Sequence, residues 1–481
     1  MKINKLLFIL FAGITFLAGC TKDFVEINTN PNASSVASPQ SLLAPVLVST
    51  INNNLDRNFR INNELMQVTV TTSDAREFHR YEIKPSESEY MWRVWYSSLT
   101  DIRDIYTNAE ATRQTGYQTF QGISLILETW VTSLLTDAFG DVPYSNAIEG
   151  RKGNTTPYFD KQQDIYTDLF KKLDSANALL SVKVNLPADI SNTEPVYGGD
   201  AAKWQKFGNS LFLRLLMRVA HKPESNAIEK IKAIVSNPLL YPIIRDSSES
   251  AILYFTNKLP YVTRFYNARD FDFNGDKGYS EFFINNLMEL QDPRLSRWAT
   301  EASLGVYGGM QSGYPKGAVP EPQSRLQLSL KTEPLLGNIM NYAELQFILA
   351  EAVLRGYING DAEAYYKKGV IANMEMWGCQ VPENYFTKPA ASFSGTEREL
   401  MNKLFLQKYF SLMFTDFQQW YEYRRTGLPE LYIGPGLLNG GKMPVRFNYP
   451  LIVQSLNKSN YDKAVAGMGG DSVNEKMWWQ P

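Results

Sequence analysis

Apolar residues that recur at steps of three and four along the chain constrain the fold more than any other feature of the sequence. One such stripe consists of Ile165, Leu169, Leu173, Ala176 and Leu180. This spacing places side chains on one face of an α-helix, whereas the side chains of a strand alternate with a period of two. Residues 201–220 (AAKWQKFGNSLFLRLLMRVA) follow a similar pattern. The sequence therefore predicts a mostly α-helical protein.

Residues 339–355 carry two neighbouring apolar stripes, so this helix is expected to be buried on most of its circumference. The stripes are Ile339, Tyr342, Gln346, Leu349 and Val353, and beside them Ala343, Phe347, Ala350 and Leu354. Gly356 and the pair Asn359-Gly360 end the helix, and a second helix is expected over residues 361–377. Such an αα-hairpin suggests tetratricopeptide-like stacking, although the chain shows no clean self-similarity at the period of about 34 residues.

The first twenty residues have the pattern of a bacterial lipoprotein signal. Lys2 and Lys5 are followed by an uncharged run over residues 6–18, which leads into Leu17-Ala18-Gly19-Cys20. The run is shorter than the roughly 20 apolar residues of a spanning helix, and its end resembles the lipobox, in which the cysteine is acylated and becomes the mature N-terminus. The alternative is an ordinary cleaved signal with a cysteine near the cut. The expected divisions are a signal peptide (1–19), a lipidated N-terminus and tether (20–40) and a single domain (41–481).

Charge and cysteine content exclude a nucleic-acid-binding protein and a disulfide scaffold. The chain has 48 Lys and Arg against 50 Asp and Glu, and no basic run supplies the surface that phosphate neutralisation requires. Once Cys20 is acylated, Cys379 is the only thiol left, so no intrachain disulfide can form. Cys379 stands beside Trp377 and is expected to be a packed thiol.

The sequence gives little support for catalysis. It contains two histidines, His79 and His221, and none of the motifs HExxH, GxSxG, GxxxxGK[ST] or CxxC. A glycosidase needs only two carboxylates, so a lipid-anchored glycoside hydrolase is the alternative function. Glu344 and Glu351 share one helix face, but a solvated stripe or pairing with one of the arginines at 424 and 425 is the favoured interpretation. We therefore expect a protein that is not an enzyme.

Long stretches without periodicity separate the helices and are expected to carry the ligand site. The longest is residues 303–338, and shorter ones are residues 72–90 and 434–444. A structureless stretch of more than about 15 residues is usually functional or disordered. The predicted ligand contacts are Tyr81, Tyr307 and Tyr314, with Arg76 for an anionic group. A tyrosine ring can stack on a sugar or on a flat peptide group, but loop tyrosines also serve as packing struts.

Residues 270–281 (DFDFNGDKGYSE) match the calcium-loop pattern D-x-[DN]-x-[DN]-G-x5-E. The candidate Ca²⁺ ligands are Asp270, Asp272, Asn274, Asp276 and Glu281. Lys277 stands where such loops carry an apolar residue, and no incoming helix precedes the motif. The alternative is a polar turn before a helix over residues 281–291 with Ser280 as its N-cap. Trp92 and Tyr96, four apart in a helical pattern, are expected to be core residues, as are Trp478 and Trp479.

Six motifs in order make the chain resemble the SusD/RagB family of outer-membrane nutrient-binding lipoproteins from Bacteroidetes, in its SusD-like branch. The motifs are residues 136–144 (TDAFGDVPY), the helix 204–218, residues 291–295 (QDPRL), 342–352 (YAELQFILAEA), 422–429 (EYRRTGLP), and the tail with GGD at 469–471 and KMWW at 476–479. Residues 20–23 (CTKD) resemble the signal that sends such lipoproteins to the outer face of the outer membrane.

The resemblance implies a fold with four tetratricopeptide-like helix pairs as a scaffold and a loop-rich face that carries the ligand site. It also implies a lid over a TonB-dependent barrel transporter of the SusC type, which captures an oligosaccharide or a peptide. Two or three acyl chains would hold the protein on the membrane permanently, because each buried methylene contributes about 0.8 kcal/mol. A purely structural tetratricopeptide adaptor is a third possibility, and it predicts no affinity for small ligands.

Overall fold

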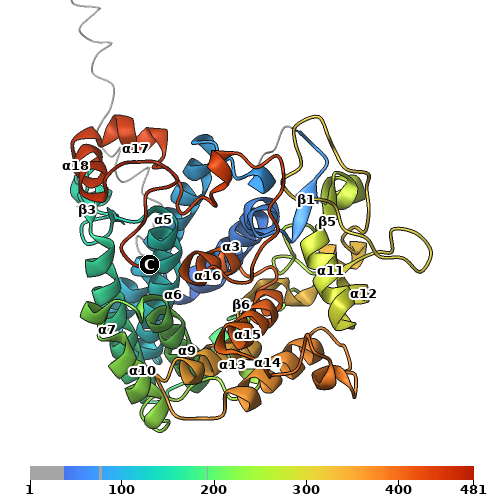
Figure 1. Ribbon diagram of the computed structural model, residues 1–481. Coiled ribbons are helices and arrows are strands. Elements are labelled where there is room, and N and C mark those ends of the chain that lie inside the picture. Colours follow the sequence, from blue (N-terminus) through green and yellow to red (C-terminus); the bar gives the residue numbers. More distant parts are fainter. Residues whose placement is uncertain (1–36, 75–77, 192) are drawn as a thin grey trace, which may run out of the picture. The chain divides into compact units, whose positions relative to one another are not determined.

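Helices build most of the protein, as the sequence predicts. The computed structural model describes residues 37–74, 78–191 and 193–481, of which residues 39–481 form one compact unit (Figure 1). The α-helices are α3 (Pro39–Arg57), α4 (Asn63–Leu65), α5 (Ser86–Thr112), α6 (Tyr117–Phe139), α7 (Gln162–Leu180), α8 (Ala188–Ser191), α9 (Ala201–Val219), α10 (Ala227–Ser236), α11 (Glu281–Leu290), α12 (Arg294–Trp298), α13 (Tyr342–Leu354), α14 (Ala362–Met376), α15 (Glu397–Ser411), α16 (Gln418–Thr426), α17 (Leu451–Leu456) and α18 (Lys458–Met468). Short 3-10 and π segments lie between them.

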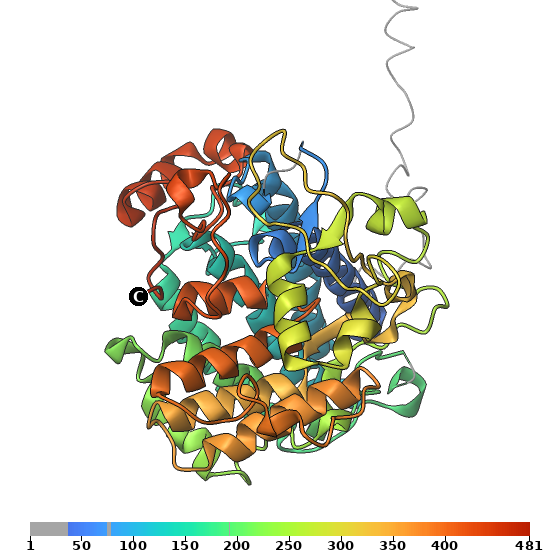
Figure 2. The same cartoon turned by 45° about the vertical axis from the view of Figure 1, so that its right-hand side comes forward.

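Successive helices pack side by side in antiparallel pairs, in the manner of tetratricopeptide repeats. Helix α6 packs against α5, α7 and α9, and every residue from 119 to 139 is buried. Its polar side chains are therefore buried as well, and Glu128 and Asp137 are both paired with cations from other helices. Helices α13, α14 and α15 form a second group, which stays together in both views (Figure 1; Figure 2). The predicted scaffold of stacked helix pairs is therefore confirmed.

The predicted αα-hairpin is present as α13 and α14, with small shifts at its ends. The first helix begins at Tyr342 and not at Ile339, because residues 338–340 form a strand and the side chain of Asn341 caps the helix. Residues 343–352 are all buried, in agreement with the double apolar stripe. Gly356 adopts a positive φ of 70° directly after the helix, which favours glycine at this position.

Three two-stranded antiparallel sheets join segments that are distant in sequence. They are β1 (Thr69–Thr71) with β5 (Lys277–Tyr279), β2 (Val142–Pro143) with β3 (Phe159–Asp160), and β4 (Ala251–Ile252) with β6 (Asn338–Met340). In the first sheet Thr69 lies opposite Tyr279. These short ladders fix the irregular segments onto the helical scaffold.

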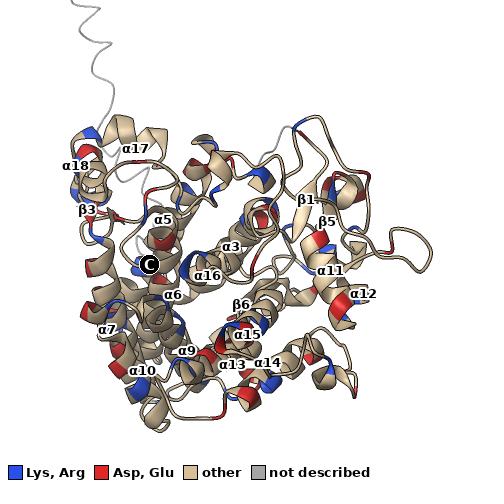
Figure 3. Ribbon diagram, viewed as in Figure 1, with Lys and Arg blue, Asp and Glu red and all other residues tan. Residues whose placement is uncertain are grey.

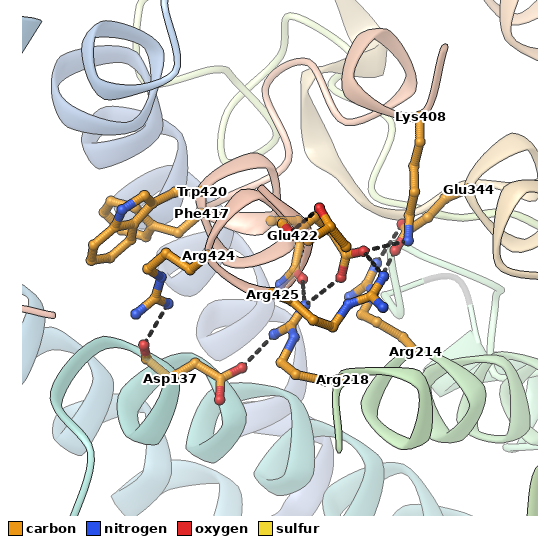
Figure 4. A network of polar contacts seen from close by, with 12 residues as sticks. Asp137, Arg214, Arg218, Glu344, Lys408, Phe417, Trp420, Glu422, Arg424 and Arg425 are labelled. Atoms are coloured by element: carbon orange, nitrogen blue, oxygen red, sulfur yellow. Dashed lines mark hydrogen bonds and ion pairs between the residues drawn. The ribbon is translucent and has the colours of Figure 1, made fainter. Parts of the chain in front are cut away.

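A buried network of charged residues ties the helices together (Figure 4). All of its members described below except Lys408 belong to the motifs of the family resemblance. Arg218 on α9 donates to Asp137 on α6, and both side chains are 0% exposed. Arg218 also pairs with Glu422 on α16 at 3.2 Å. Lys408 on α15 pairs with the other oxygen of Glu422 at 2.8 Å. Four helices from distant parts of the chain therefore share one electrostatic centre.

Glu344 and Glu351, the two carboxylates on one face of α13, belong to the same region. Glu351 receives a bidentate fork from Arg425 at 2.6 and 2.7 Å, and Glu344 receives one from Arg214 at 2.6 Å for both contacts. The predicted pairing of a helix carboxylate with an arginine at 424 or 425 is confirmed. Arg424 instead lies 3.8 Å above the ring of Trp420 and donates to the Asp137 carbonyl at 2.6 Å. The motifs thus encode the scaffold.

The N-terminal predictions fall mostly on residues that the structure does not describe. The signal peptide, Cys20 and the tether up to residue 36 lie outside the described residues. Helix α3 begins at Pro39, two residues before the predicted boundary at residue 41. No helix in residues 37–74, 78–191 and 193–481 is long and apolar enough to cross a membrane.

Candidate functional site

The three irregular segments that the sequence singled out come together in space. Gly436 donates a backbone hydrogen bond to the Gly313 carbonyl at 2.7 Å, and Leu438 donates one to the Arg80 carbonyl at 2.7 Å. A Cβ on Gly436 would lie 2.4 Å from the backbone of Pro315, so only glycine allows this close approach of the two loops. The predicted loop-rich face is therefore present.

Two of the predicted ligand-binding tyrosines are struts inside this face. Tyr314 is 1% exposed, stacks on His79 with ring centroids 4.5 Å apart, and donates its hydroxyl to the Thr71 carbonyl at 2.9 Å. Tyr81 is 5% exposed and packs in the main core. The expectation that these rings are presented on the surface is wrong, because both lie beneath the loops they support. Burial, followed by the charge of Asp74, raises the pKa of Tyr314 to about 12.

His79 joins the segments as a neutral acceptor. Burial, with the nearby charge of Arg80, lowers the pKa of His79 to about 3, and its Nδ1 accepts a hydrogen bond from the Gly313 backbone at 3.2 Å. Of the other predicted contacts, Tyr307 is half-buried against the core, and Arg76 lies outside the described residues. Ligand contact by Tyr307 stays a prediction.

The predicted calcium loop does not assemble its ligands. Asp270 pairs with Lys331 at 2.8 Å, and Asp272 forms a fork with Arg269 at 2.7 and 2.8 Å. The segment Phe271–Gly275 is a π-helical turn, and Ser280 caps α11 through the backbone N–H of Phe283, as the alternative interpretation predicted. Asn274 donates its amide to a carbonyl, and Asp276 follows the turn directly before β5. Glu281 is the first residue of α11.

Among the residues described, no three His, Cys, Asp or Glu side chains form a group that could hold a metal ion. The motif matched the calcium pattern in sequence, but its first two carboxylates, Asp270 and Asp272, are directed to neighbouring cations and not to a common centre. Cys379 is half-buried, and burial raises the pKa of its thiol, in agreement with a packed and unreactive side chain.

Two cavities lie on either side of the segment that links β2 to β3, and we name them A and B. Cavity A has a volume of about 650 Å³ and is lined by Arg103, Tyr106, Thr107, Leu125, Glu128, Tyr144, Ser145, Asp160, Asp164, Ile165, Asp168 and Lys172. Cavity B has a volume of about 220 Å³ and is lined by Trp92, Tyr96, Pro143, Ala147, Ile148, Thr155, Pro157, Ile452, Val453, Leu456 and Asn457. Cavity A has the size typical of small-molecule sites.

One stripe of α5 contributes to both cavities. Trp92 and Tyr96 line cavity B, and Arg103 and Thr107 line cavity A. Their spacing of four, seven and four residues places all four side chains on the same face of the helix. With a rise of about 1.5 Å per residue, Tyr96 and Arg103 are about 10 Å apart along the axis. The cavities are therefore neighbours on one face.

The floor of cavity A is a fixed set of charges. The buried Glu128 accepts a hydrogen bond from Arg103 Nε at 2.8 Å and pairs with Lys172 Nζ at 3.2 Å. Arg103 also donates to the carbonyls of Tyr144 and Ala147 at 3.1 Å each. Because every group of this guanidinium is engaged, Arg103 holds the wall between the two cavities against α5.

The side wall of cavity A presents carboxylates and a tyrosine. The Tyr144 hydroxyl donates to Asp168 at 2.5 Å, and burial together with the negative charge of Glu128 raises the pKa of this phenol above its usual range. Asp160 accepts from the backbone N–H groups of Tyr144 and Ser145 at 2.9 Å each. Asp168 keeps a side chain that is 46% exposed. Exposed carboxylate oxygens can accept hydrogen bonds from the hydroxyl groups of a ligand.

Cavity B is apolar and aromatic, and the sequence prediction missed it. Trp92 packs edge-on against Phe139 and Tyr449, yet its side chain keeps partial exposure and lines the cavity. The prediction that Trp92 is a core residue is therefore only partly right. Tyr96 donates its hydroxyl to the Pro143 carbonyl at 2.6 Å. The sequence signal for this site is the stripe on α5, where Trp92 and Tyr96 are followed on the same helix face by Arg103 and Thr107. A change from aromatic to polar residues along one face indicates that this face is not simply part of the core.

Most of the chain matches the model of one protein family. A family model of the SusD-like group, described as "Starch-binding associating with outer membrane", matches residues 31–450. The chain belongs to the SusD-like family. A search of curated proteins finds no match to the SusD-like chain. Helix α17 and the residues after it lie beyond the matched range, so one wall of cavity B comes from residues outside the family match.

Solved structures share the fold of the SusD-like chain. A SusD homolog from Bacteroides fragilis is 22% identical with a TM-score of 0.81, covering 92% of this chain and 100% of its own. A chitin-binding protein is 26% identical with a TM-score of 0.78, covering 92% and 99%. A chitin-binding SusD homolog from Flavobacterium johnsoniae is 20% identical with a TM-score of 0.78, covering 92% and 98%.

Proposed function

We propose that this SusD-like protein captures oligosaccharides at the cell surface and passes them to a TonB-dependent barrel transporter of the SusC type. The observation that carries the proposal is cavity A, a polar cavity of about 650 Å³ on a rigid helical scaffold. Its volume lies within the range of about 300–1,000 Å³ for small-molecule sites. The family description as starch-binding and the chitin-binding relatives support a glycan over a peptide.

The chemistry of cavity A suits sugar hydroxyls. Carboxylates such as Asp164 and Asp168 accept hydroxyl hydrogen bonds, and charge-assisted bonds of this kind are the stronger ones. Tyr106 stands on the lining with 37% of its surface exposed, so its ring is free to stack on the C–H face of a pyranose. Glu128 and Lys172 keep each other in place before the ligand arrives, which reduces the ordering cost of binding.

The remaining parts of the proposal rest on the resemblance and on the N-terminal sequence. Acylation of Cys20 would hold the protein on the outer membrane, facing the exterior. The transporter partner is proposed from the resemblance to the SusD/RagB family. The protein itself is proposed to bind and not to cleave its ligand.

Calorimetric titration with a panel of soluble oligosaccharides and peptides tests the proposal. Tyr106→Ala is expected to weaken glycan binding by about 5- to 30-fold, corresponding to about 1–2 kcal/mol for a lost stacking contact. Tyr266→Ala is the matched control, because Tyr266 has a similar exposure of 38% and lines neither cavity. Binding of peptides alone, release of reducing sugar from the panel, or equal effects of the two variants would contradict the proposal.

A further inference from the structure

Cavity B differs from cavity A in carrying no charged side chain. Its lining consists of aromatic, aliphatic and proline residues with Thr155 and Asn457 as the polar members. Helix α17, which forms one wall, contains no Lys, Arg, Asp or Glu, and Figure 3 shows it in the neutral colour while α7 beside cavity A carries both signs. A charged group would lose its hydration in cavity B without gaining a partner. The occupant is therefore uncharged.

Cavity B has four lining side chains that can form hydrogen bonds, of which Tyr96 and Asn457 are engaged and Thr155 is exposed. The Tyr96 hydroxyl donates to the Pro143 carbonyl at 2.6 Å, and the Asn457 amide donates to the Pro157 carbonyl at 2.6 Å. The indole N–H of Trp92 makes no hydrogen bond to any residue that the structure describes. Several hydroxyl groups placed here would lack partners, which is costly for buried polar groups. The cavity suits a small group with an apolar end and one acceptor.

Cavity B lies close enough to cavity A for one ligand to occupy both. The two cavities share the α5 stripe and are separated by about 10 Å along the helix, so one oligosaccharide can reach both. The wall between them is the segment from Pro143 to Ala147, which Tyr96 holds at its first residue and Arg103 at its last, both from the same face of α5. Exposed side chains continue from cavity B along α17, where Ile452 is 46% and Leu456 is 69% exposed. This arrangement leaves cavity B open to the surface.

We propose that cavity B binds the acetamido group of an N-acetylated sugar unit while cavity A binds the hydroxyl groups of neighbouring units. The methyl group would lie against Ile452 and Leu456, and the amide carbonyl would accept from Trp92. This inference rests on the proposed function and adds the substrate class, an oligosaccharide that contains N-acetylhexosamine.

Three oligosaccharides with the same β-1,4 backbone isolate the acetamido group. The N-acetylglucosamine tetramer, the glucosamine tetramer and the glucose tetramer differ only in the substituent at C2. In calorimetric titrations we expect the N-acetylated tetramer to bind at least tenfold more tightly than the glucose tetramer, and the protonated glucosamine tetramer to gain no advantage from cavity B.

Leu456→Asp places a charge at the rim of cavity B on an exposed position, so the fold should tolerate it. We expect this variant to reduce the preference for the acetylated over the glucose tetramer to twofold or less, with the glucose tetramer bound as before. Leu239→Asp is the matched control, because Leu239 is 99% exposed and lines neither cavity. Trp92→Phe keeps a ring but removes the N–H, and should lower the preference by about threefold or more.

The outcomes separate the two proposals. Equal affinity for the acetylated and glucose tetramers, both lost in Tyr106→Ala, would overturn the inference and leave the proposed function standing. Tightest binding of the glucosamine tetramer would assign selectivity to the carboxylates of cavity A and overturn the inference as well. Self-association that Leu456→Asp abolishes, with unchanged glycan preference, would make α17 an interface between copies. Binding of none of the three tetramers, nor of other glycans, would overturn both proposals.

Discussion

Replacing Arg218 by methionine tests the buried charge network most directly. The side chains of Arg218 and Asp137 are 0% exposed, and Arg218 is one of three cations that pair with Glu422. Methionine keeps much of the aliphatic volume but leaves Asp137 without its ion-pair partner. Removing one partner of a buried pair costs about 3–5 kcal/mol, because the remaining charge is not solvated. We expect a loss of about 5 kcal/mol, at the upper end of this range, since two carboxylates are affected.

The pH dependence of this loss identifies its cause. In Arg218→Met the buried Asp137 carboxylate loses its ion-pair partner, because the neighbouring Arg424 donates to the Asp137 backbone carbonyl and not to the carboxylate. Burial without a paired cation favours the neutral form of a carboxyl, so the folded-state pKa of such a group lies above the unfolded value. A carboxyl with a raised folded pKa destabilises the protein when it is ionised, and protonation removes that penalty. The difference in unfolding free energy between the wild type and the variant should therefore shrink as the pH falls from about 7.5 to about 5.

Denaturant unfolding followed by tryptophan fluorescence measures both effects. Arg398→Met is the control, because its ion pair with Glu430 is 81% and 55% exposed and solvent screens such a pair, so its loss should change the stability little. The double variant Asp137→Leu/Arg218→Met should recover part of the stability, since it removes the unpaired charge. If Arg218→Met loses no more stability than the control, or if its deficit grows as the pH falls, the network does not act as described.

Four further predictions follow from the described residues and from the N-terminal sequence. Tyr314→Ala should lower the free energy of unfolding by about 3–5 kcal/mol in thermal or denaturant melts, because Tyr314 is a buried strut. Burial would raise the pKa of Glu422, but Arg425, Lys408 and Arg218 hold that pKa well below its usual value. The ionised Glu422 should therefore stabilise the fold at neutral pH, and this stabilisation should be lost only below about pH 4.5. Acid titration followed by circular dichroism measures the loss. The melting temperature should not respond to calcium or to a chelator, and Glu281→Gln should behave like the wild type, whereas a chelator-sensitive melt would restore the calcium loop. Cys20→Ala should move the protein from the membrane fraction to soluble fractions or leave it as precursor, and full membrane retention of a mature unacylated form would refute the anchor.

The candidate site shows where the sequence prediction reached its limit. The tyrosines at 81 and 314 stand in segments without periodicity, so they were expected on the surface, but three such segments stack on one another and bury them. Trp92 stands in a helical pattern, which predicts a core position, but it lines cavity B. Helix α17, more than 350 residues later in the chain, covers this cavity on one side only, so Trp92 stays partly exposed. Exposure in both cases depends on which distant segments meet.

The sequence by itself determined the helices, because the period of apolar residues, the capping residues and the glycine stops are local properties of the chain. It also indicated the family and the calcium-like pattern of residues 270–281. Only the tertiary structure decided that Asp270 and Asp272 turn to Lys331 and Arg269, since a ligand set needs side chains that converge in space. The same reason explains cavities A and B, whose walls come from α5, α7, the β2–β3 segment and, in cavity B, α17, and no local pattern encodes their meeting.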